Sequence, residues 1–280
     1  MTSDGTARVW VDGRLLEDPD EGVITVRDHG FTVGDGVFEA VKIVDGRPFA
    51  LSRHLRRLDR SATGLGLTPC DEDVVREGVA AVLEGSTMPL GRLRITQTAG
   101  PAPMGSGRTG EEAGTLVVAA APMQPRGKPA HVVTVPWPRN ERGALAGLKT
   151  TSYAENVVAL ARAAKQGGDE AVFANLAGNL CEGTGSNVFY VVDGELRTPS
   201  LASGCLAGIT RELLLEWCDV VEVDEPIEVL ERAQEVFLAS TTRDVQWVAR
   251  CDDRSWDESG PVTQATARTW REREQADIDP

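Results

Sequence analysis

Aromatic and histidine side chains are scarce in this chain of 280 residues. Aromatics make up 5% of it, with two tyrosines, and there are three histidines. Aliphatic residues, mainly Val, Leu, Ala and Ile, must therefore fill most of the interior. The hydrophobic content of 41% is enough for a sizeable core. The length suits one large domain or two moderate ones.

Motifs that hold metals or disulfides are missing as well. No CxxC pair and no HExxH run occurs, and the five cysteines are widely spaced. An odd number of scattered cysteines favours reduced, mostly buried thiols over a disulfide framework. We therefore expect no metal centre and no disulfide.

Positive charge is in short supply. The chain has 29 Lys and Arg against 43 Asp and Glu, a formal net charge of −14, which argues against a nucleic-acid partner. No apolar run approaches the length of a membrane span, and Met1–Gly5 lacks the basic and apolar segments of a signal peptide. We expect a cytoplasmic protein with no membrane partner.

What the sequence does contain is a series of strands, turns and helices. Asp–Gly pairs at 12–13, 45–46 and 193–194 predict tight hairpin turns. The run 36–44 alternates, which places Phe38, Ala40 and Lys42 on one face of a strand and Val37, Val41 and Ile43 on the other. Apolar spacing predicts helices over 51–65 and 73–83, and the run 93–98 reads as a strand.

A proline-rich segment, 121–129, is the best candidate for a linker, because three prolines in nine residues discourage both helix and strand. We therefore predict a small N-terminal α/β domain over 1–120. A larger C-terminal domain over 130–280 would be β-rich with flanking helices. The fold class is α+β. The Gly-, Pro- and Ser-rich run 99–114 is predicted to be a loop, either a plain surface loop or one that lines a site.

Two segments carry residues with specific chemistry. Lys149 follows a glycine-containing turn and precedes a helix, and a lysine amine is the side chain that forms a stable imine with an aldehyde. Glu182 ends a strand before a Gly/Ser turn, where a carboxylate could keep a heterocyclic nitrogen protonated. Each has an ordinary alternative, since Lys149 alone reads as a surface lysine and Glu182 as a turn residue.

Two further segments suit a phosphate. The run 206–214 has the form of a helix that begins after Gly208, where free backbone N–H groups and the helix dipole attract anions. Thr210 adds a hydroxyl there, and the run 238–244 clusters hydroxyls at the end of a strand. An ordinary helix cap and a Ser/Thr turn explain these two segments equally well on their own.

Taken in order along the chain, these segments resemble the class IV aminotransferases, the fold-type IV family of enzymes that use pyridoxal 5′-phosphate (PLP). The similarity is closest to D-amino acid aminotransferases and aminodeoxychorismate lyases, and it covers nearly the whole chain. Each motif is weak alone, and their order and spacing make the resemblance specific. It rests on these matches: Asp28–Glu39, His54–Leu58, Lys149, Glu182–Gly183 with Ser186–Asn187, Gly208–Arg211 and Ser240–Thr242.

The resemblance implies a role for each cofactor residue. Lys149 would be the catalytic residue and hold PLP as a Schiff base, and Glu182 would pair with the pyridine nitrogen. Arg57 would bind the phosphate with its planar guanidinium. Five residues complete the implied cofactor site: Ser186, Asn187, Ile209, Thr210 and Thr241. Arg142 matches in position an arginine near the lysine of the D-amino acid enzymes, with Arg139 as a rival.

The implied substrate site departs from the family pattern. Phe38 and Ala40 would line the pocket, with Lys42 and Thr242 beside them, although core packing is an equal alternative for Phe38 and Ala40. Phe38 stands where the D-amino acid enzymes have tyrosine. Their Arg-x-His run, which holds the substrate carboxylate, is replaced by Met104 and Ser106. The substitute cations are Arg108, Arg27, His29 and Arg94.

Three functions remain open at this point. The first is a transaminase that moves an amino group between a D-amino acid and a 2-oxoacid. The second is an aminodeoxychorismate lyase, which would use Lys149 and Glu182 to release pyruvate and leave 4-aminobenzoate. The third is a scaffold that binds no PLP. The resemblance also implies a homodimer.

Overall fold

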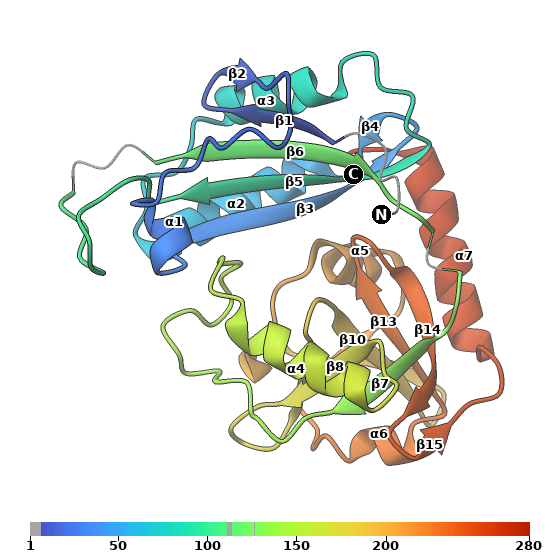
Figure 1. The fold of residues 1–280 in the computed structure, drawn as a ribbon. Helices are drawn as coiled ribbons and strands as arrows, with labels where there is room; N and C mark the ends of the chain where they lie inside the picture. Colours follow the sequence, from blue (N-terminus) through green and yellow to red (C-terminus); the bar gives the residue numbers. More distant parts are fainter. Residues whose placement is uncertain (1–6, 111–113, 126) are drawn as a thin grey trace. The chain divides into compact units, whose positions relative to one another are not determined.

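The computed structural model describes residues 7–110, 114–125 and 127–280, so Arg126 of the predicted linker and three residues of the predicted loop lie outside the described part. The chain divides into two compact units (Figure 1). Unit 1 comprises 1–125, 148–153 and 278–280. Unit 2 comprises 126–147 and 154–277. Residues 148–153, Lys149 among them, group with unit 1 although they follow the predicted linker.

Unit 1 is built on a six-stranded antiparallel sheet in the order β2-β1-β6-β5-β3-β4. The central pair, β3 and β5, is nine residues long on each side and in continuous register. The elements of unit 1 are β1 (Arg8–Val11), β2 (Arg14–Leu15), α1 (His29–Thr32), β3 (Gly36–Val44), β4 (Arg47–Pro48), α2 (Leu51–Leu65), α3 (Glu72–Leu83), β5 (Leu90–Thr98) and β6 (Leu116–Pro122).

Alternation along β3 sorts its side chains as the sequence predicts. Val37, Val41 and Ile43 are fully buried in the core that α2 and α3 form against the sheet. Phe38, Ala40 and Lys42 have the opposite parity, so they lie on the other face. One face of the sheet is thus covered by helices, and the second carries the predicted substrate residues.

Unit 2 contains a nine-stranded mixed sheet, with eight strands in the order β12-β11-β10-β13-β14-β7-β8-β9 and β15 paired to β14. Its strands are β7 (Ala130–Thr134), β8 (Glu170–Ala174), β9 (Leu180–Gly183), β10 (Asn187–Val192), β11 (Glu195–Pro199), β12 (Val221–Val223), β13 (Glu235–Ser240), β14 (Asp244–Cys251) and β15 (Arg254–Ser255). Its helices are α4 (Ala154–Lys165), the short 3₁₀ helix η1 (Leu201–Ser203), α5 (Ile209–Trp217), α6 (Val229–Arg232) and α7 (Pro261–Ala276).

The core of unit 2 lies on both faces of this sheet. Strands β10, β13 and β14 pack with α6 in one apolar cluster, and α4 packs through Ala159 and Ala163 against β7 and β8 in another. Phe189 and Phe237 stack at 4.9 Å on neighbouring strands. The turns that follow Glu182 and Ser240 begin at the ends of strands β9 and β13.

All three Asp–Gly pairs form the predicted turns. Asp12, Asp45 and Asp193 have φ of 45°, 46° and 52°, and each following glycine is also at positive φ. Two successive residues at positive φ are what a type I′ hairpin requires. The paired strands are β1–β2, β3–β4 and β10–β11.

Candidate active site

Lys149 is fixed in unit 1 by backbone pairing with the start of β3. The Phe38 N–H donates to the Lys149 carbonyl at 3.0 Å, and the Thr151 N–H donates to the Gly36 carbonyl at 2.8 Å. The Lys149 N–H also donates to Ser61 Oγ of α2 at 3.2 Å. The side chain reaches the Phe38 ring, with Nζ 4.4 Å from the ring centroid, a distance at which the ring attracts an ammonium group.

Arg57, the predicted phosphate ligand, belongs to a buried cluster of charges on α2 and β3. Its Nε and Nη2 donate to the two carboxylate oxygens of Glu39 at 2.7 and 2.6 Å, and His54 Nδ1 lies 2.6 Å from the second oxygen. Burial by itself would raise the pKa of Glu39, but Arg57 and His54 outweigh it and lower that pKa to about 2. Burial also lowers the pKa of His54. Glu39 therefore orients the Arg57 guanidinium.

Thr242, a predicted substrate residue, lies in unit 2, and the other four lie at two places in unit 1. Phe38 and Lys42 are buried and Ala40 is half-buried on the face of β3 near Lys149. Arg108 lies in the loop after β5, where it pairs with both oxygens of Asp35 and donates to the Leu65 carbonyl. A substrate carboxylate could engage Arg108 only by competing with these acceptors.

Two other cations proposed for the carboxylate differ in access. His29 is 1% exposed and its Nε2 lies 3.0 Å from the Pro103 carbonyl, so its ring is enclosed by the loop. Arg94 is exposed on β5, and its guanidinium carbon lies 4.0 Å from the centroid of the Phe38 ring. Of these two, Arg94 is the one that lies beside the ring contacted by Lys149.

Glu182 is held in unit 2 by a backbone hydrogen bond and an ion pair. Its Oε2 accepts from the Leu206 N–H at 2.9 Å, and its Oε1 lies 3.2 Å from Nε of Arg139. Arg139 in turn lies over the Phe173 ring at 4.2 Å. Arg142, which had been matched to the family arginine, is 81% exposed and pairs with its neighbour Glu141. Arg139 is therefore the arginine that contacts the carboxylate.

The predicted phosphate residues of unit 2 come together at one end of β10 and β13. Asn187 begins β10 opposite Ala239 of β13, and its side-chain nitrogen donates to the Leu206 carbonyl at 2.9 Å. A Cβ on Gly208 would lie 2.1 Å from Asn187 Oδ1, so this close approach requires glycine. Helix α5 begins directly after Gly208, and no side chain among the described residues caps it.

A phosphate fits this end of unit 2. The N–H groups of Ile209 and Thr210 lie in the first turn of α5, where a helix provides no acceptor of its own. The hydroxyl of Ser240 is buried with no hydrogen-bond partner in the part of the chain described here. Thr241 and Thr242 follow it at half-buried positions. An anion with several acceptor oxygens would satisfy such donors.

One buried ion pair beside the candidate site, Glu170 with Arg243, was not predicted from the sequence. Glu170 is 1% exposed and accepts from the Thr184 N–H at 3.0 Å and from Ser186 Oγ at 3.1 Å. Arg243 donates to the same carboxylate at 3.0 Å. Glu170 and Arg243 thereby join the turn after Glu182 to the turn after β13. The only sequence signal for this hydrogen-bond network was the Ser- and Thr-rich composition of the two turns that it joins.

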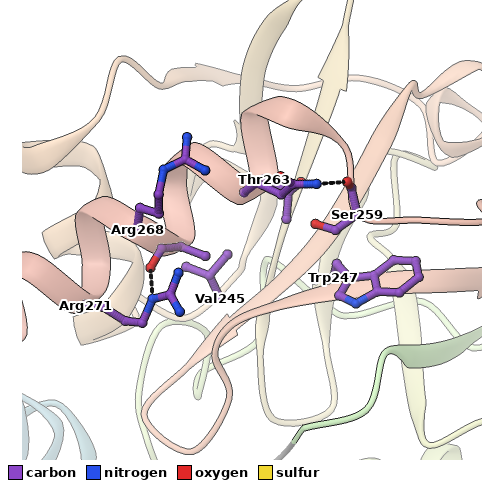
Figure 2. A pocket seen from close by; sticks show the side chains of 8 residues that line it. Val245, Trp247, Ser259, Thr263, Arg268 and Arg271 are labelled. Atoms are coloured by element: carbon purple, nitrogen blue, oxygen red, sulfur yellow. Dashed lines mark hydrogen bonds between the residues drawn. The ribbon is translucent and has the colours of Figure 1, made fainter.

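Away from these residues, a hollow of about 210 Å³ lies between α7 and β14 of unit 2 (Figure 2). Its lining residues are Val245, Trp247, Ser259, Thr263, Gln264, Ala267, Arg268 and Arg271. None of the predicted cofactor or substrate residues lines it.

Over residues 7–110, 114–125 and 127–280, no group of three or more His, Cys, Asp or Glu is arranged to hold a metal ion. No helix in those ranges has the length and hydropathy to span a membrane.

A family model described as "Amino-transferase class IV" matches residues 36–251. The chain belongs to the class IV aminotransferase family. Enzymes of this family depend on PLP, and this aminotransferase has the fold of the fold-type IV enzymes, with mixed helix and strand. The match includes Arg57, Lys149 and Glu182 and extends past the hydroxyl-rich turn at 240–242.

Curated relatives of this aminotransferase carry three different names. It is 30% identical to a putative branched-chain-amino-acid aminotransferase of Methanocaldococcus jannaschii, over 88% of each chain. It is 28% identical to the D-alanine aminotransferase of Staphylococcus haemolyticus, over 91% of this chain and 94% of the relative. It is 26% identical to the aminodeoxychorismate lyase of Bacillus subtilis, over 92% and 91%.

Solved structures agree on the fold. A branched-chain aminotransferase from Thermoproteus uzoniensis with norvaline superposes with a TM-score of 0.86 at 29% identity, over 94% of this chain and 93% of that one. A hypothetical aminotransferase from Mycobacterium tuberculosis in its PLP-bound form gives 0.85 at 26% identity, over 94% and 97%. The family and the cofactor are thus established, and the substrate is not among the properties that these relatives share.

Proposed function

We propose that this class IV aminotransferase transfers an amino group between a D-amino acid and a 2-oxoacid, with Lys149 as its catalytic residue. The observation that carries the proposal is the position of Lys149. Its backbone pairs with the start of β3, and its ammonium lies against Phe38, on the sheet face that helices leave uncovered. A reactive amine at a fixed place beside an apolar wall suits repeated proton transfer to a bound substrate.

PLP, when bound, accepts the electron pair that is released when the Cα–H bond of the substrate breaks. With the cofactor in place, Lys149 Nζ would take the proton from the substrate Cα and would also be the group that returns it. Phe38 packs beside Nζ and restricts its position. Because the same amine serves both proton transfers, one lysine is sufficient for the exchange, and a second 2-oxoacid reverses the steps.

Residues of unit 2 supply charge and hydrogen bonds to the cofactor. The carboxylate of Glu182, already fixed by Arg139 and the Leu206 N–H, would pair with the pyridine nitrogen and keep it protonated. The first N–H groups of α5 and nearby hydroxyls would bind the phosphate, and the family resemblance implies Arg57 as a further phosphate ligand. The remaining proposed ligands are Ser186, Asn187, Ile209, Thr210 and Thr241.

Two lines of support favour a D-amino acid. The run Val37–Lys42 resembles the corresponding strand of D-amino acid aminotransferases, and several curated relatives are named D-alanine aminotransferase. The aminodeoxychorismate lyase of Bacillus subtilis, similar over 92% of this chain, makes a lyase the second candidate. In that reaction Lys149 and Glu182 would keep their places while pyruvate is released.

Half-reactions decide between these functions. The holoenzyme is mixed with D-alanine, L-alanine, L-leucine or aminodeoxychorismate, and the cofactor spectrum is followed together with the products. A D-amino acid transaminase forms pyruvate from D-alanine, and 2-oxoglutarate from D-glutamate and pyruvate. Faster reaction of the L-amino acids overturns the D preference, and release of 4-aminobenzoate supports the lyase.

Lys149→Ala tests the catalytic residue itself. Turnover should disappear, and borohydride reduction of the wild-type holoenzyme should leave a pyridoxyl group on the peptide that contains position 149. Lys165→Ala, at the end of α4, is the matched control and should keep wild-type activity. A Lys149→Ala enzyme with more than a trace of activity refutes the assignment.

We also propose that the chain forms a homodimer in the cytoplasm. Helix α4 exposes Val157 at 62% and Val158 at 54%, an apolar surface that a second copy could cover. The five free cysteines suit a reducing compartment. Light scattering at micromolar concentration should give twice the mass of one chain, and Val157→Asp should lower it. A monomeric wild-type protein would contradict the proposal.

A further inference from the structure

We propose that the buried ion pair of Glu170 and Arg243 positions two turns of unit 2 for the cofactor phosphate, an inference that rests on the proposed function. The first turn is 183–186, at the end of β9, and the second is 240–243, at the end of β13. Neither member of the pair is among the proposed cofactor ligands. Both would act through the turns, as positioning residues rather than catalytic ones.

Glu170 binds the first turn to the start of β8. One of its carboxylate oxygens accepts from the N–H of Thr184 at 3.0 Å and from the Thr184 hydroxyl, and the other accepts from Ser186 Oγ at 3.1 Å. Gly183 leaves room for these bonds, because a Cβ there would lie 2.5 Å from Ser186 Oγ and 3.2 Å from the carboxylate carbon of Glu170. The buried carboxylate therefore fixes the path of the turn.

The first turn offers backbone donors to an anion. The Gly183 N–H is used within the turn, where it donates to the Ser186 carbonyl at 2.7 Å. The N–H groups of Gly185 and Ser186 make no hydrogen bond with the residues that the structure describes. Successive free N–H groups in a turn attract anions such as phosphate. The direction of these donors depends on the path of the turn, and so on Glu170.

Arg243 closes the second turn and connects it to the same carboxylate. Its backbone N–H donates to the Ser240 carbonyl at 3.0 Å, and its Nη2 donates to Glu170 at 3.0 Å. The Ser240 hydroxyl is buried and has no hydrogen-bond partner among the described residues. The hydroxyls of Thr241 and Thr242 lie on the same turn. A displacement of Arg243 would therefore move all three hydroxyls.

The sheet itself does not make this connection. The ladder between β10 and β13 ends at the pair Asn187–Ala239, and the two turns lie beyond that end. Arg243 is 9% exposed and Glu170 is 1% exposed, so each needs the other as a partner for its buried charge. The other carboxylate near Arg243, that of Asp169 at 3.6 Å, is 48% exposed. Loss of either partner should let the turns shift against each other.

Glu170→Gln tests the proposal because it removes the charge and keeps the size of the side chain. The dissociation constant of PLP, measured by fluorescence titration, should rise about tenfold, the lower end of the effect seen when a residue that supports a ligand is replaced. The phosphorus-31 NMR signal of the bound phosphate should move from its wild-type position. At saturating PLP, kcat should stay within about threefold of wild type, because Lys149 and Glu182 are unchanged.

Glu235→Gln is the matched control. Glu235 is also a buried carboxylate of unit 2, and it accepts from the N–H groups of Val262 and Thr263 at 3.1 and 2.7 Å, away from both turns. Its replacement may lower the melting temperature as much as Glu170→Gln does. It should change PLP affinity less than about twofold and leave the phosphorus signal in place, since distant sites act independently. Equal losses of affinity in the two variants overturn the proposal.

Arg243→Met and the double variant test the pair as a unit. Arg243→Met should weaken PLP at least as much as Glu170→Gln, because it leaves a buried carboxylate unpaired. The double variant removes both charges, so its loss of affinity should be smaller than the product of the two single losses. Losses that multiply would mean that the two residues act separately, which overturns the proposal. If Glu170→Gln does not fold, Arg243→Met carries the same two measurements.

Failure of this proposal is distinguishable from failure of the proposed function. A wild-type protein that neither binds PLP nor becomes labelled at Lys149 after borohydride reduction refutes the proposed function. A labelled wild type, together with Glu170→Gln and Arg243→Met variants that match it in PLP affinity and in the phosphorus signal, refutes the role of the ion pair alone.

Discussion

Replacing Glu39 with Gln should destabilise the protein by about 3–5 kcal/mol, the cost expected when a buried ion pair loses one partner. The side chain is fully buried and bonded to both Arg57 and His54. The pKa of Glu39 falls from 4.5 to about 2 because these partners outweigh the effect of burial. At 1.36 kcal/mol per pKa unit, that difference corresponds to roughly 3 kcal/mol.

The same linkage fixes the pH dependence. Because the folded protein lowers the pKa of Glu39, its stabilisation is complete above pH 4.5 and disappears as the pH falls toward 2. Urea unfolding of wild type and Glu39→Gln, at pH 7 and in steps down to pH 3, should show a free-energy difference that shrinks in acid.

Glu72→Gln removes an exposed carboxylate paired with Arg76 and should cost at most about 0.5 kcal/mol at pH 7. It serves as the matched control for the Glu39 variant. A Glu39→Gln protein as stable as this control, or a difference that does not shrink in acid, would refute the reasoning.

Two further predictions concern unit 2 and are read by fluorescence titration with PLP. Gly208→Ala would place a Cβ 2.1 Å from a side-chain oxygen, so we expect about tenfold weaker PLP binding (~1.4 kcal/mol). Gly185→Ala meets no atom within 4 Å and should change affinity less than twofold; equal losses in both would contradict the packing argument. Arg139→Leu removes the cation 3.2 Å from Glu182 and should also weaken PLP about tenfold, whereas Arg142→Leu, at an exposed position, should leave affinity unchanged.

Local patterns were sufficient for much of unit 1. The Asp–Gly turns depend on the φ that two adjacent residues can adopt, and the alternation along β3 depends on a period of two. Both are properties of a few neighbouring residues. Helix α7 was not predicted from the sequence, because its buried residues Thr263, Thr266 and Trp270 do not form a continuous apolar stripe. Its signals were Pro261 at the first helical position and Gly260 before it.

Some contacts of the candidate site could not be predicted from the sequence because they join residues that are far apart along the chain. Arg108 and Asp35 are 73 residues apart in sequence, and Glu170 and Arg243 are also 73 apart. No local pattern links residues at such separations. The choice between two nearby arginines at Glu182 was equally undetermined, because it depends on which one reaches the aromatic ring of a distant strand.

The short segment 148–153 has a consequence for how this enzyme could be rebuilt. It belongs to unit 1 by its hydrogen bonds, yet the chain on both sides of it belongs to unit 2. A chimaera made by joining the first 125 residues to the rest of a relative would pair β3 with a foreign segment. The catalytic amine would then be anchored on a mismatched ladder. Exchanging 148–153 and 278–280 together with the N-terminal piece keeps the pairing native, so the interchangeable module is discontinuous in sequence.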